Sequence, residues 1–156
     1  MNKKYELLVD DTITFFGRKL FRIKALISFG SVEAGELGGY VAKEGNLSHE
    51  GNAWVSDNAR VYGDARVFDN AEVYGNAEVY GDAWVKSLKD YIVFKNNWSS
   101  GRYFTYTKSN KMWKAGCFYG AGQELINEAY EDSENSGKHY EAYVKFVEML
   151  EELENE

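Results

Sequence analysis

Residues 51–85, GNAWVSDNARVYGDARVFDNAEVYGNAEVYGDAWV, decide the fold of this chain. Alanine recurs with a period of six, at Ala53, Ala59, Ala65, Ala71, Ala77 and Ala83. A valine follows each alanine two residues later, from Val55 to Val85. Asn or Asp precedes every alanine, and Gly or Asp precedes that residue. A helix does not produce this pattern, because six is not a multiple of its 3.6-residue period.

Each hexad predicts a short strand followed by a sharp turn. Ala and Val share one face of the strand because they lie two residues apart, and they fill a narrow interior. The Gly/Asp–Asn/Asp pair accepts the left-handed backbone angles that a sharp turn requires. With three hexads in each coil, residues 18 apart in the sequence become neighbours in adjacent strands. This register stacks Tyr62 on Tyr80 and places Arg60 next to Glu78 as a charge pair.

The six unbroken hexads resemble those of hexapeptide-repeat proteins of the kind found in phages and prophages. The preceding segment, GELGGYVAKEGNLSHEGNAWV, is similar to the entry segment of such proteins. The resemblance implies a left-handed parallel β-helix, commonly assembled as a homotrimer, and it implies no particular activity. We therefore predict a mainly β chain in which residues 33–86 form about three coils of left-handed parallel β-helix.

Two smaller units are expected to flank the repeat. Residues 1–32 contain the apolar runs TITFF and KLFRIKAL, which predict a β-hairpin that covers the first open end of the repeat. Residues 87–156 predict a small α+β module. Its three short strands are expected in LKDYIVFK, RYFTYTK and MWKAGCFY, and two helices follow, the second with Ser133 or Ser136 as its N-cap.

Composition limits the classes of function. The chain has 156 residues, no proline, one cysteine and a net charge of −7, and 16% of its residues are aromatic. It is too aromatic to be disordered, and its apolar runs are too short to span a membrane. With no recognisable signal peptide and a single cysteine, we expect a cytoplasmic protein, in the host cytoplasm if a phage encodes it. The acidic total argues against general nucleic-acid binding.

Six large aromatic side chains are expected to point outward from the repeat. They are Trp54, Tyr62, Phe68, Tyr74, Tyr80 and Trp84. Isolated aromatic residues are normal on a protein surface. Because Tyr62 and Tyr80 recur in register, however, we expect the six to form a contiguous patch and to serve as the interface of a homotrimer.

A basic, aromatic segment at residues 98–114, WSSGRYFTYTKSNKMWK, contains no acidic residue. Arg and Lys beside aromatic rings can hold a phosphate together with a nucleobase, so the segment predicts a ligand site. The candidate ligand-binding residues are Trp98, Arg102, Tyr103, Tyr106, Lys108, Trp113 and Lys114. In the competing interpretation, one aromatic face packs beneath the helices and the lysines balance the acidic residues of 118–156.

No residue is expected to be catalytic, and neither a metal nor a cofactor is expected. Hexapeptide acyltransferases use a histidine as general base, and the one candidate here is His49, with Glu50 to orient it. The alternative is a structural histidine that is hydrogen-bonded locally. Two histidines are too few for the three-histidine zinc site of hexapeptide carbonic anhydrases. Cys117 lies in the apolar run AGCFYG, which indicates a buried small side chain.

These features favour a non-enzymatic, homotrimeric binding protein, encoded by a phage or prophage, that sequesters or blocks a host factor. The candidate factors are a nucleotide signal and a defence protein. The expected partners are therefore further copies of the chain and either a host protein or a small anionic, nucleotide-like ligand. The alternatives are a hexapeptide-repeat acyltransferase that uses His49 and a purely structural assembly module.

Overall fold

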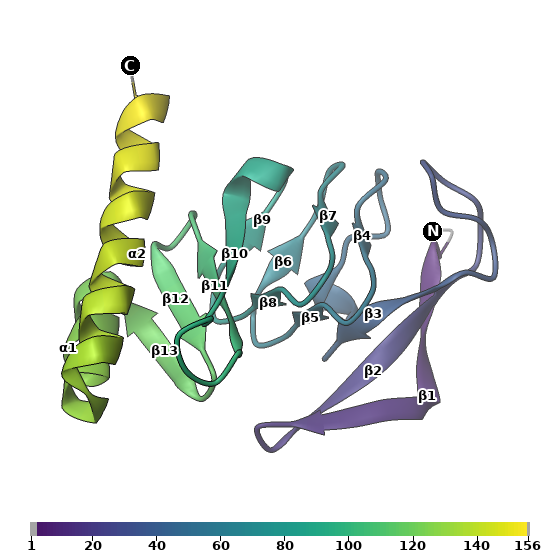
Figure 1. Ribbon diagram of the computed structural model, residues 1–156. Helices are drawn as coiled ribbons and strands as arrows, with labels where there is room; N and C mark the ends of the chain where they lie inside the picture. The colour runs from purple at the N-terminus through teal and green to yellow at the C-terminus, as the bar shows by residue number, and fades with distance from the viewer. Residues whose placement is uncertain (1–2, 156) are drawn as a thin grey trace.

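The computed structural model describes residues 3–155, in which short strands lie between an N-terminal hairpin and a C-terminal unit with two helices (Figure 1). The hairpin strands are β1 (Tyr5–Phe15) and β2 (Arg18–Ala25), and β3 (Leu37–Val41) follows them. The hexads form the two-residue strands β4 (Trp54–Val55), β5 (Arg60–Val61), β6 (Arg66–Val67), β7 (Glu72–Val73), β8 (Glu78–Val79) and β9 (Trp84–Val85). The C-terminal unit consists of β10 (Tyr91–Lys95), β11 (Tyr103–Thr107), β12 (Met112–Ala115), β13 (Phe118–Ala121), α1 (Gly122–Asp132) and α2 (Glu134–Glu154).

The 18-residue register predicted for the hexads is confirmed. β4 pairs with β7, β5 with β8 and β6 with β9, each pair parallel, so that Trp54 lies opposite Glu72 and Arg66 opposite Trp84. Tyr62 stacks on Tyr80 with 4.5 Å between the ring centroids. The repeating alanines and valines are all buried and belong to one core. Their small side chains allow the backbones on opposite sides of this core to approach closely.

The turn chemistry predicted for the hexads is also confirmed. The first residue of every Gly/Asp–Asn/Asp pair has a positive φ. Four of these six positions are glycines, for which such angles are unstrained, and the others are Asp57 and Asp69, with φ of 58° and 56°. The Asp57 carboxylate also accepts a hydrogen bond of 3.0 Å from the amide of Gly75, the corresponding turn residue 18 positions later. This bond links the two turns.

The predicted fold class, a mainly β chain built on a left-handed parallel β-helix, is wrong. The described residues form four small sheets and two helices. One sheet is mixed, with the strand order β1-β2-β3-β5-β8, one is antiparallel, with the order β10-β11-β12-β13, and two are the parallel pairs β4-β7 and β6-β9. Because each hexad strand is only two residues long, the parallel pairing stays local. The longer strands β1, β2, β10 and β11 pair antiparallel instead, so the fold is mixed.

The N-terminal hairpin forms where the two apolar runs predict it. Its turn residues, Phe16 and Gly17, have φ of 50° and 76°, and two positive angles in succession match the twist of antiparallel strands. β2 continues into antiparallel pairing with β3, which joins the hairpin to the repeat. The tip of the hairpin extends back beneath the repeat toward the C-terminal sheet (Figure 1). There the Lys114 ammonium lies 4.5 Å from the centroid of the Phe16 ring.

The C-terminal sheet has four strands where three were expected. The run MWKAGCFY predicts one strand, but Gly116 adopts a φ of 59° and turns the chain between β12 and β13. The predicted helices are present, and Ser133 is the N-cap of α2, because its hydroxyl accepts a 3.0 Å hydrogen bond from the amide of Ser136. Neither of these helices is both long enough and apolar enough to cross a membrane.

Candidate functional site

Strand alternation divides the predicted ligand-binding residues between two faces of the C-terminal sheet. Tyr106 of β11 and Trp113 of β12 point toward the helices and form a core with Val147 of α2. Thr105 of β11 points the other way, and its hydroxyl accepts a 3.0 Å hydrogen bond from the amide of Glu78 in the repeat. The sheet is therefore packed on both sides, by the helices on one and by β8 on the other.

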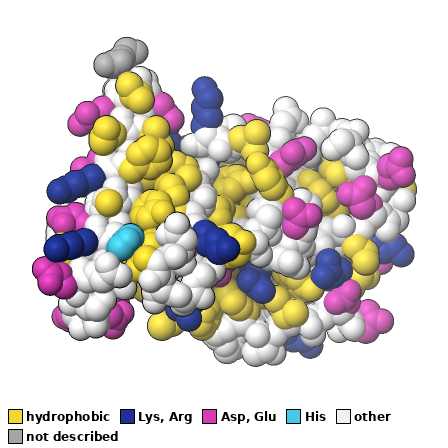
Figure 2. Space-filling model, in the orientation of Figure 1, with side chains coloured by type: hydrophobic (Ala, Val, Ile, Leu, Met, Phe, Trp, Pro, Cys, Tyr) yellow, Lys and Arg dark blue, Asp and Glu magenta, His cyan; other side chains and the backbone are white. Residues whose placement is uncertain are grey.

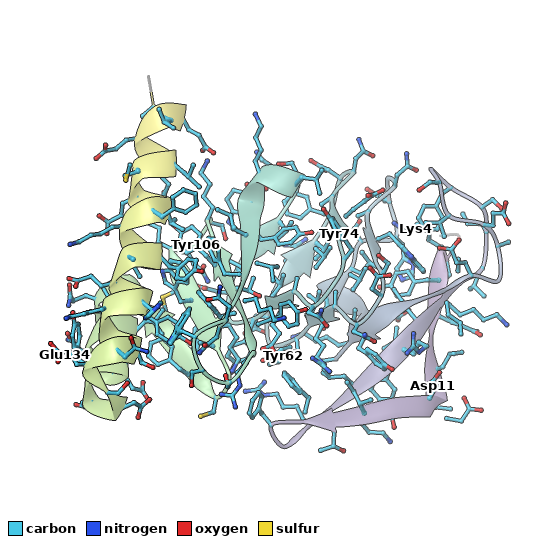
Figure 3. The ribbon with its side chains drawn as sticks, viewed as in Figure 1. Lys4, Asp11, Tyr62, Tyr74, Tyr106 and Glu134 are labelled. Atoms are coloured by element: carbon cyan, nitrogen blue, oxygen red, sulfur yellow. The ribbon has the colours of Figure 1, made fainter. Side chains whose placement is uncertain are left out.

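The structure places Tyr106 and Trp113 in the protein interior rather than at a ligand site. Trp113 is 2% exposed, and Tyr106 is buried with its hydroxyl donating to the Glu151 carboxylate at 2.6 Å. Figure 3 shows Tyr106 beside α2, away from Tyr62 in the repeat. Burial and the adjacent Glu151 raise the pKa of Tyr106 well above its usual range. For these two residues, packing beneath the helices is the role that the structure supports.

Trp98 and Lys108 are likewise engaged with α2. The Trp98 indole stacks on His139 with 4.5 Å between ring centroids and donates a 3.3 Å hydrogen bond to Ser136. Lys108 pairs with Glu154 near the end of the helix. Neighbouring Lys111 lies 2.6 Å from Glu151 in a second ion pair. Basic side chains of this segment therefore balance acidic side chains of α2, as the competing interpretation predicted.

The other three candidates, Arg102, Tyr103 and Lys114, lie where the hairpin, the repeat and the C-terminal sheet meet. A cleft of about 370 Å³ opens there, which we call the junction cleft. The side chains that give it its chemistry are Phe15, Phe16, Arg60, Glu78, Arg102 and Tyr103. Lys114 adjoins the cleft through Phe16. This volume lies within the ~300–1,000 Å³ typical of small-molecule sites.

Two guanidinium groups in the junction cleft lack protein partners. The ion pairs and side-chain hydrogen bonds formed among residues 3–155 include none from the guanidinium of Arg60 or Arg102. Nε of Arg60 is buried from solvent without a hydrogen-bond partner. A buried donor without an acceptor is costly, so Arg60 retains an unused capacity to donate hydrogen bonds. The planar guanidinium suits bidentate binding of phosphate or carboxylate.

Glu78 is the carboxylate that faces these cations. Its strand pairs with that of Arg60 in the predicted register, yet the expected charge pair is not among the ion pairs within 4.0 Å. Burial raises the pKa of Glu78, while the positive charges of Lys114, Arg60 and Arg102 act to lower it. Its Oε2 atom is also buried without a partner. The site therefore combines several cations with a single carboxylate.

Aromatic rings position the cations around the junction cleft. The guanidinium of Arg60 lies 4.3 Å from the centroid of the Phe15 ring, and the ammonium of Lys114 lies 4.5 Å from that of Phe16. Such contacts hold a cation without neutralising it. Arg102 packs closely on Gly116, where an added Cβ would lie 2.1 Å from its Nη1 atom. Burial lowers the pKa of Lys114, although the charge of Glu78 partly opposes this effect.

The junction cleft also contains residues outside 98–114 that the sequence analysis did not identify as part of a site. Arg60 and Glu78 could have been found from the 18-residue register, which already placed them side by side. Phe15 and Phe16 carried no such signal, because their contribution depends on where the hairpin tip packs. The cleft is a meeting of distant segments rather than a linear motif.

The aromatic residues predicted to form a trimer interface divide into buried and exposed groups. Trp54 is 4% exposed and lies edge-on to Tyr5 and Phe29, so its own chain covers it. Tyr62, which is labelled in Figure 3, is 1% exposed. Its ring lies edge-on to that of Phe15 in the hairpin. The structure corrects the expectation that these two point into solvent, because β1 and the segment after β2 pack over them.

The remaining four aromatics are still accessible to different degrees. Phe68 and Tyr80 are half-buried, whereas Tyr74 and Trp84 are 50% and 41% exposed. Tyr80 is occupied within the chain, since Arg18 lies 4.9 Å from its ring centroid and donates a 2.7 Å hydrogen bond to its hydroxyl. The six residues therefore do not form one continuous outward patch.

His49 is held on both sides by its own chain. Its ring stacks on Tyr5 at 4.2 Å, and Nδ1 accepts a 3.1 Å hydrogen bond from the backbone amide of Lys4. Nε2 lies 3.3 Å from the carboxylate of Glu44, so Glu44 and not Glu50 is its acidic neighbour. With both ring nitrogens engaged, the geometry supports the structural interpretation over a general base.

Cys117 is exposed in the turn between β12 and β13, so the expectation of a buried cysteine is wrong. The run AGCFYG contains a turn rather than a continuous strand, which brings the thiol to the surface.

Comparison with known proteins adds no relative: no protein-family model matches the chain, and no curated protein matches it significantly.

Proposed function

We propose that this protein binds a small anionic ligand that carries a flat ring, such as a nucleotide, in the junction cleft. The observation that carries the proposal is the pair of unpartnered guanidinium groups of Arg60 and Arg102 in one cleft. Both cations are available for the phosphate, and the half-exposed ring of Tyr103 is available for the base.

The proposed activity is binding without chemical conversion. The cleft supplies cations and rings, which recognise a ligand, and the one acid–base candidate in it is Glu78, whose carboxylate is surrounded by positive charge. We propose sequestration of a host nucleotide as the biological use, which rests on the cleft and on the expected phage origin, since the resemblance of the hexads by itself implies no particular activity. Assembly into a homotrimer is not required for this cleft, which residues of a single chain complete.

Binding of AMP by isothermal titration calorimetry tests the proposal. We expect saturable binding of AMP and weaker binding of adenosine and of inorganic phosphate, because each retains only half of the contacts. Arg102→Gln should weaken AMP binding by roughly 10- to 100-fold, the usual effect of removing a charged hydrogen-bond donor.

Arg66→Gln is the matched control. Arg66 occupies the same hexad position as Arg60, but it is exposed on β6, outside the junction cleft. Its replacement should leave the affinity within about twofold of the wild-type value. Absence of AMP binding at millimolar concentration, or equal losses in the Arg102 and Arg66 variants, would refute the proposed site.

A further inference from the structure

β10 is an open edge of the C-terminal sheet. It pairs with β11 on one side, from Tyr91 opposite Thr107 to Lys95 opposite Tyr103, and no other strand of the described chain pairs with it. The amide of Lys108 donates to the carbonyl of Asp90, and the amide of Asn96 donates to the carbonyl of Arg102. These bonds show which residues of β10 face β11, because inward and outward bonding alternate along a strand.

By this alternation, the backbone groups of Tyr91, Val93 and Lys95 point away from β11 toward the open edge. Proteins commonly protect such an edge with a proline, a bulge, several charges or a covering loop. β10, with the sequence YIVFK, has no proline and no bulge, and its one charge is Lys95. The unpaired N–H and C=O groups are therefore available for a further strand.

Apolar surface surrounds this open edge. A groove of about 470 Å³ runs beside β10 and is lined by Tyr74, Leu88, Ile92, Val93 and Tyr103. Leu88 is 58% exposed and Tyr74 50% exposed, well above what a satisfied core residue shows. Figure 2 shows hydrophobic side chains gathered on the same face of the molecule, over α2 and the neighbouring sheet.

The outer side of α2 adds to this surface. Phe146, Met149 and Leu153 are spaced three and four residues apart and are 45%, 61% and 62% exposed. Because they share one side of the helix, they form an apolar stripe rather than isolated contacts. The open edge of β10 and the apolar stripe of α2 lie on one face of the molecule. A partner could therefore extend the sheet at this edge and pack against the helix.

The sequence of β10 complements itself in an antiparallel pair centred on Val93. In that register, Tyr91 of each copy lies opposite Lys95 of the other, so that the one charged residue of each strand meets an uncharged one. Ile92 lies opposite Phe94, an aliphatic–aromatic pair on the opposite face. No like charges meet, and Val93 lies opposite Val93 of the second copy, on the two-fold axis. The outward groups of the three residues on each strand would form about six backbone hydrogen bonds.

We propose that this edge is occupied by a second copy of the chain, so that two four-stranded sheets join through β10 into one continuous sheet around a two-fold axis. Such an interface is isologous, the commonest kind in soluble oligomers. It rests on different observations from the ligand proposed for the junction cleft, although Tyr103 lines both the groove beside β10 and that cleft.

Sedimentation equilibrium between 1 and 100 µM tests the proposal. We expect a dimer with twice the 17.8 kDa chain mass. Lys95→Pro should yield a monomer, because proline removes an outward N–H and its ring obstructs the approaching carbonyl, while the side chain it replaces is exposed. Lys95→Ala is the control, because it keeps the N–H and should remain dimeric, with at most a few-fold weaker association.

Hydrogen exchange gives a second measure at the level of single residues. The Val93 amide should be protected in the wild-type dimer and should exchange freely in Lys95→Pro, while amides of β11 and β12 stay protected in both and show that the variant is folded. A wild-type monomer at 100 µM, a trimer, or a Lys95→Pro variant that is folded and still dimeric would each overturn the proposal.

Discussion

At the residue scale, Glu78 determines how strongly the junction cleft can attract an anion. The half-buried side chain lies among cations, and its buried Oε2 atom has no hydrogen-bond partner. When ionised, it cancels part of the positive charge that the ligand would meet. When protonated, it removes this repulsion and can donate a hydrogen bond to an anionic oxygen. The protonation state of one side chain therefore couples to ligand affinity.

Glu78→Gln should raise the affinity for AMP at pH 7.5, because the substitution removes a negative charge next to the phosphate. We expect roughly a tenfold gain, which corresponds to about 1.4 kcal/mol. Since burial raises the folded-state pKa of Glu78 above its ordinary 4.5, the wild-type carboxyl takes up its proton as the pH falls toward that raised value. The ratio of the wild-type Kd to the Glu78→Gln Kd should therefore fall toward one at acidic pH.

Titration calorimetry of both proteins at several pH values between 5 and 8 measures this ratio. Free AMP also titrates in this range, but the protonation of the free ligand is common to the two proteins and cancels in the ratio of their Kd values. A ratio that stays constant with pH would show that Glu78 does not change its charge near the ligand.

At the element scale, the hexad turns show how a local backbone rule becomes a structural repeat. Every turn begins with a residue of positive φ. This residue is glycine in all the turns except two, where it is Asp57 or Asp69. The surroundings of the glycines nevertheless differ. A Cβ at Gly51 would lie 2.5 Å from the carbonyl oxygen of Asp69, whereas a Cβ at Gly75 would have no neighbour within 4 Å. Turns with the same angles should therefore tolerate substitution differently.

Gly75→Ala should lower the free energy of unfolding by about 1 kcal/mol, the usual penalty of a left-handed angle for an L-residue. Gly51→Ala has nearly the same φ but must also displace a backbone carbonyl, so we expect a loss of about 3 kcal/mol. Urea unfolding of both variants measures the difference. Equal losses would mean that the turn at Gly51 moves to accommodate the methyl group.

At the scale of the whole molecule, the chain has separate cores. The repeat and hairpin share one that contains Ile23 and Val61 and a smaller one around Leu20 and Tyr62, while the C-terminal unit has another around Trp113. In the described chain, no buried residue of the Trp113 cluster belongs to either of the other two. The two parts meet at the junction cleft, through the hydrogen bond between β8 and β11, and through β10, whose Tyr91 is buried in the core of the repeat with Val93 packed against it. Because β11, β12 and α2 share a core of their own, we expect the two parts to differ in local stability.

Trp113→Ala should destabilise the C-terminal unit by about 3–5 kcal/mol, because it leaves a large cavity in that core. Hydrogen exchange should accelerate in β10–β13 and α2 more than in the hexad strands. Trp84→Ala, which removes an indole that is 41% exposed, is the control and should change exchange much less. Equal acceleration across both parts would indicate a single cooperative unit.

The candidate site was predictable only in part. Residues 98–114 were identified as basic and aromatic from the sequence, but Arg102 and Trp113 have opposite roles in the structure. Arg102 lines the junction cleft, whereas Trp113 is buried under α2. Alternation along a strand predicts which residues share a face. It does not predict whether helices or another sheet will cover that face, because this depends on long-range packing.

The sequence by itself determined the features that depend on local backbone rules. The positions of the turns follow from Gly and Asp at the start of each hexad, and the 18-residue register follows from the buried Ala and Val. Only the tertiary structure decided the mixed sheet order and the site. The junction cleft requires Phe16, Arg60 and Arg102, which no local pattern links, to meet when the hairpin tip packs beneath the repeat. Such contacts reflect the burial of whole surfaces against one another, which short-range periodicity does not encode.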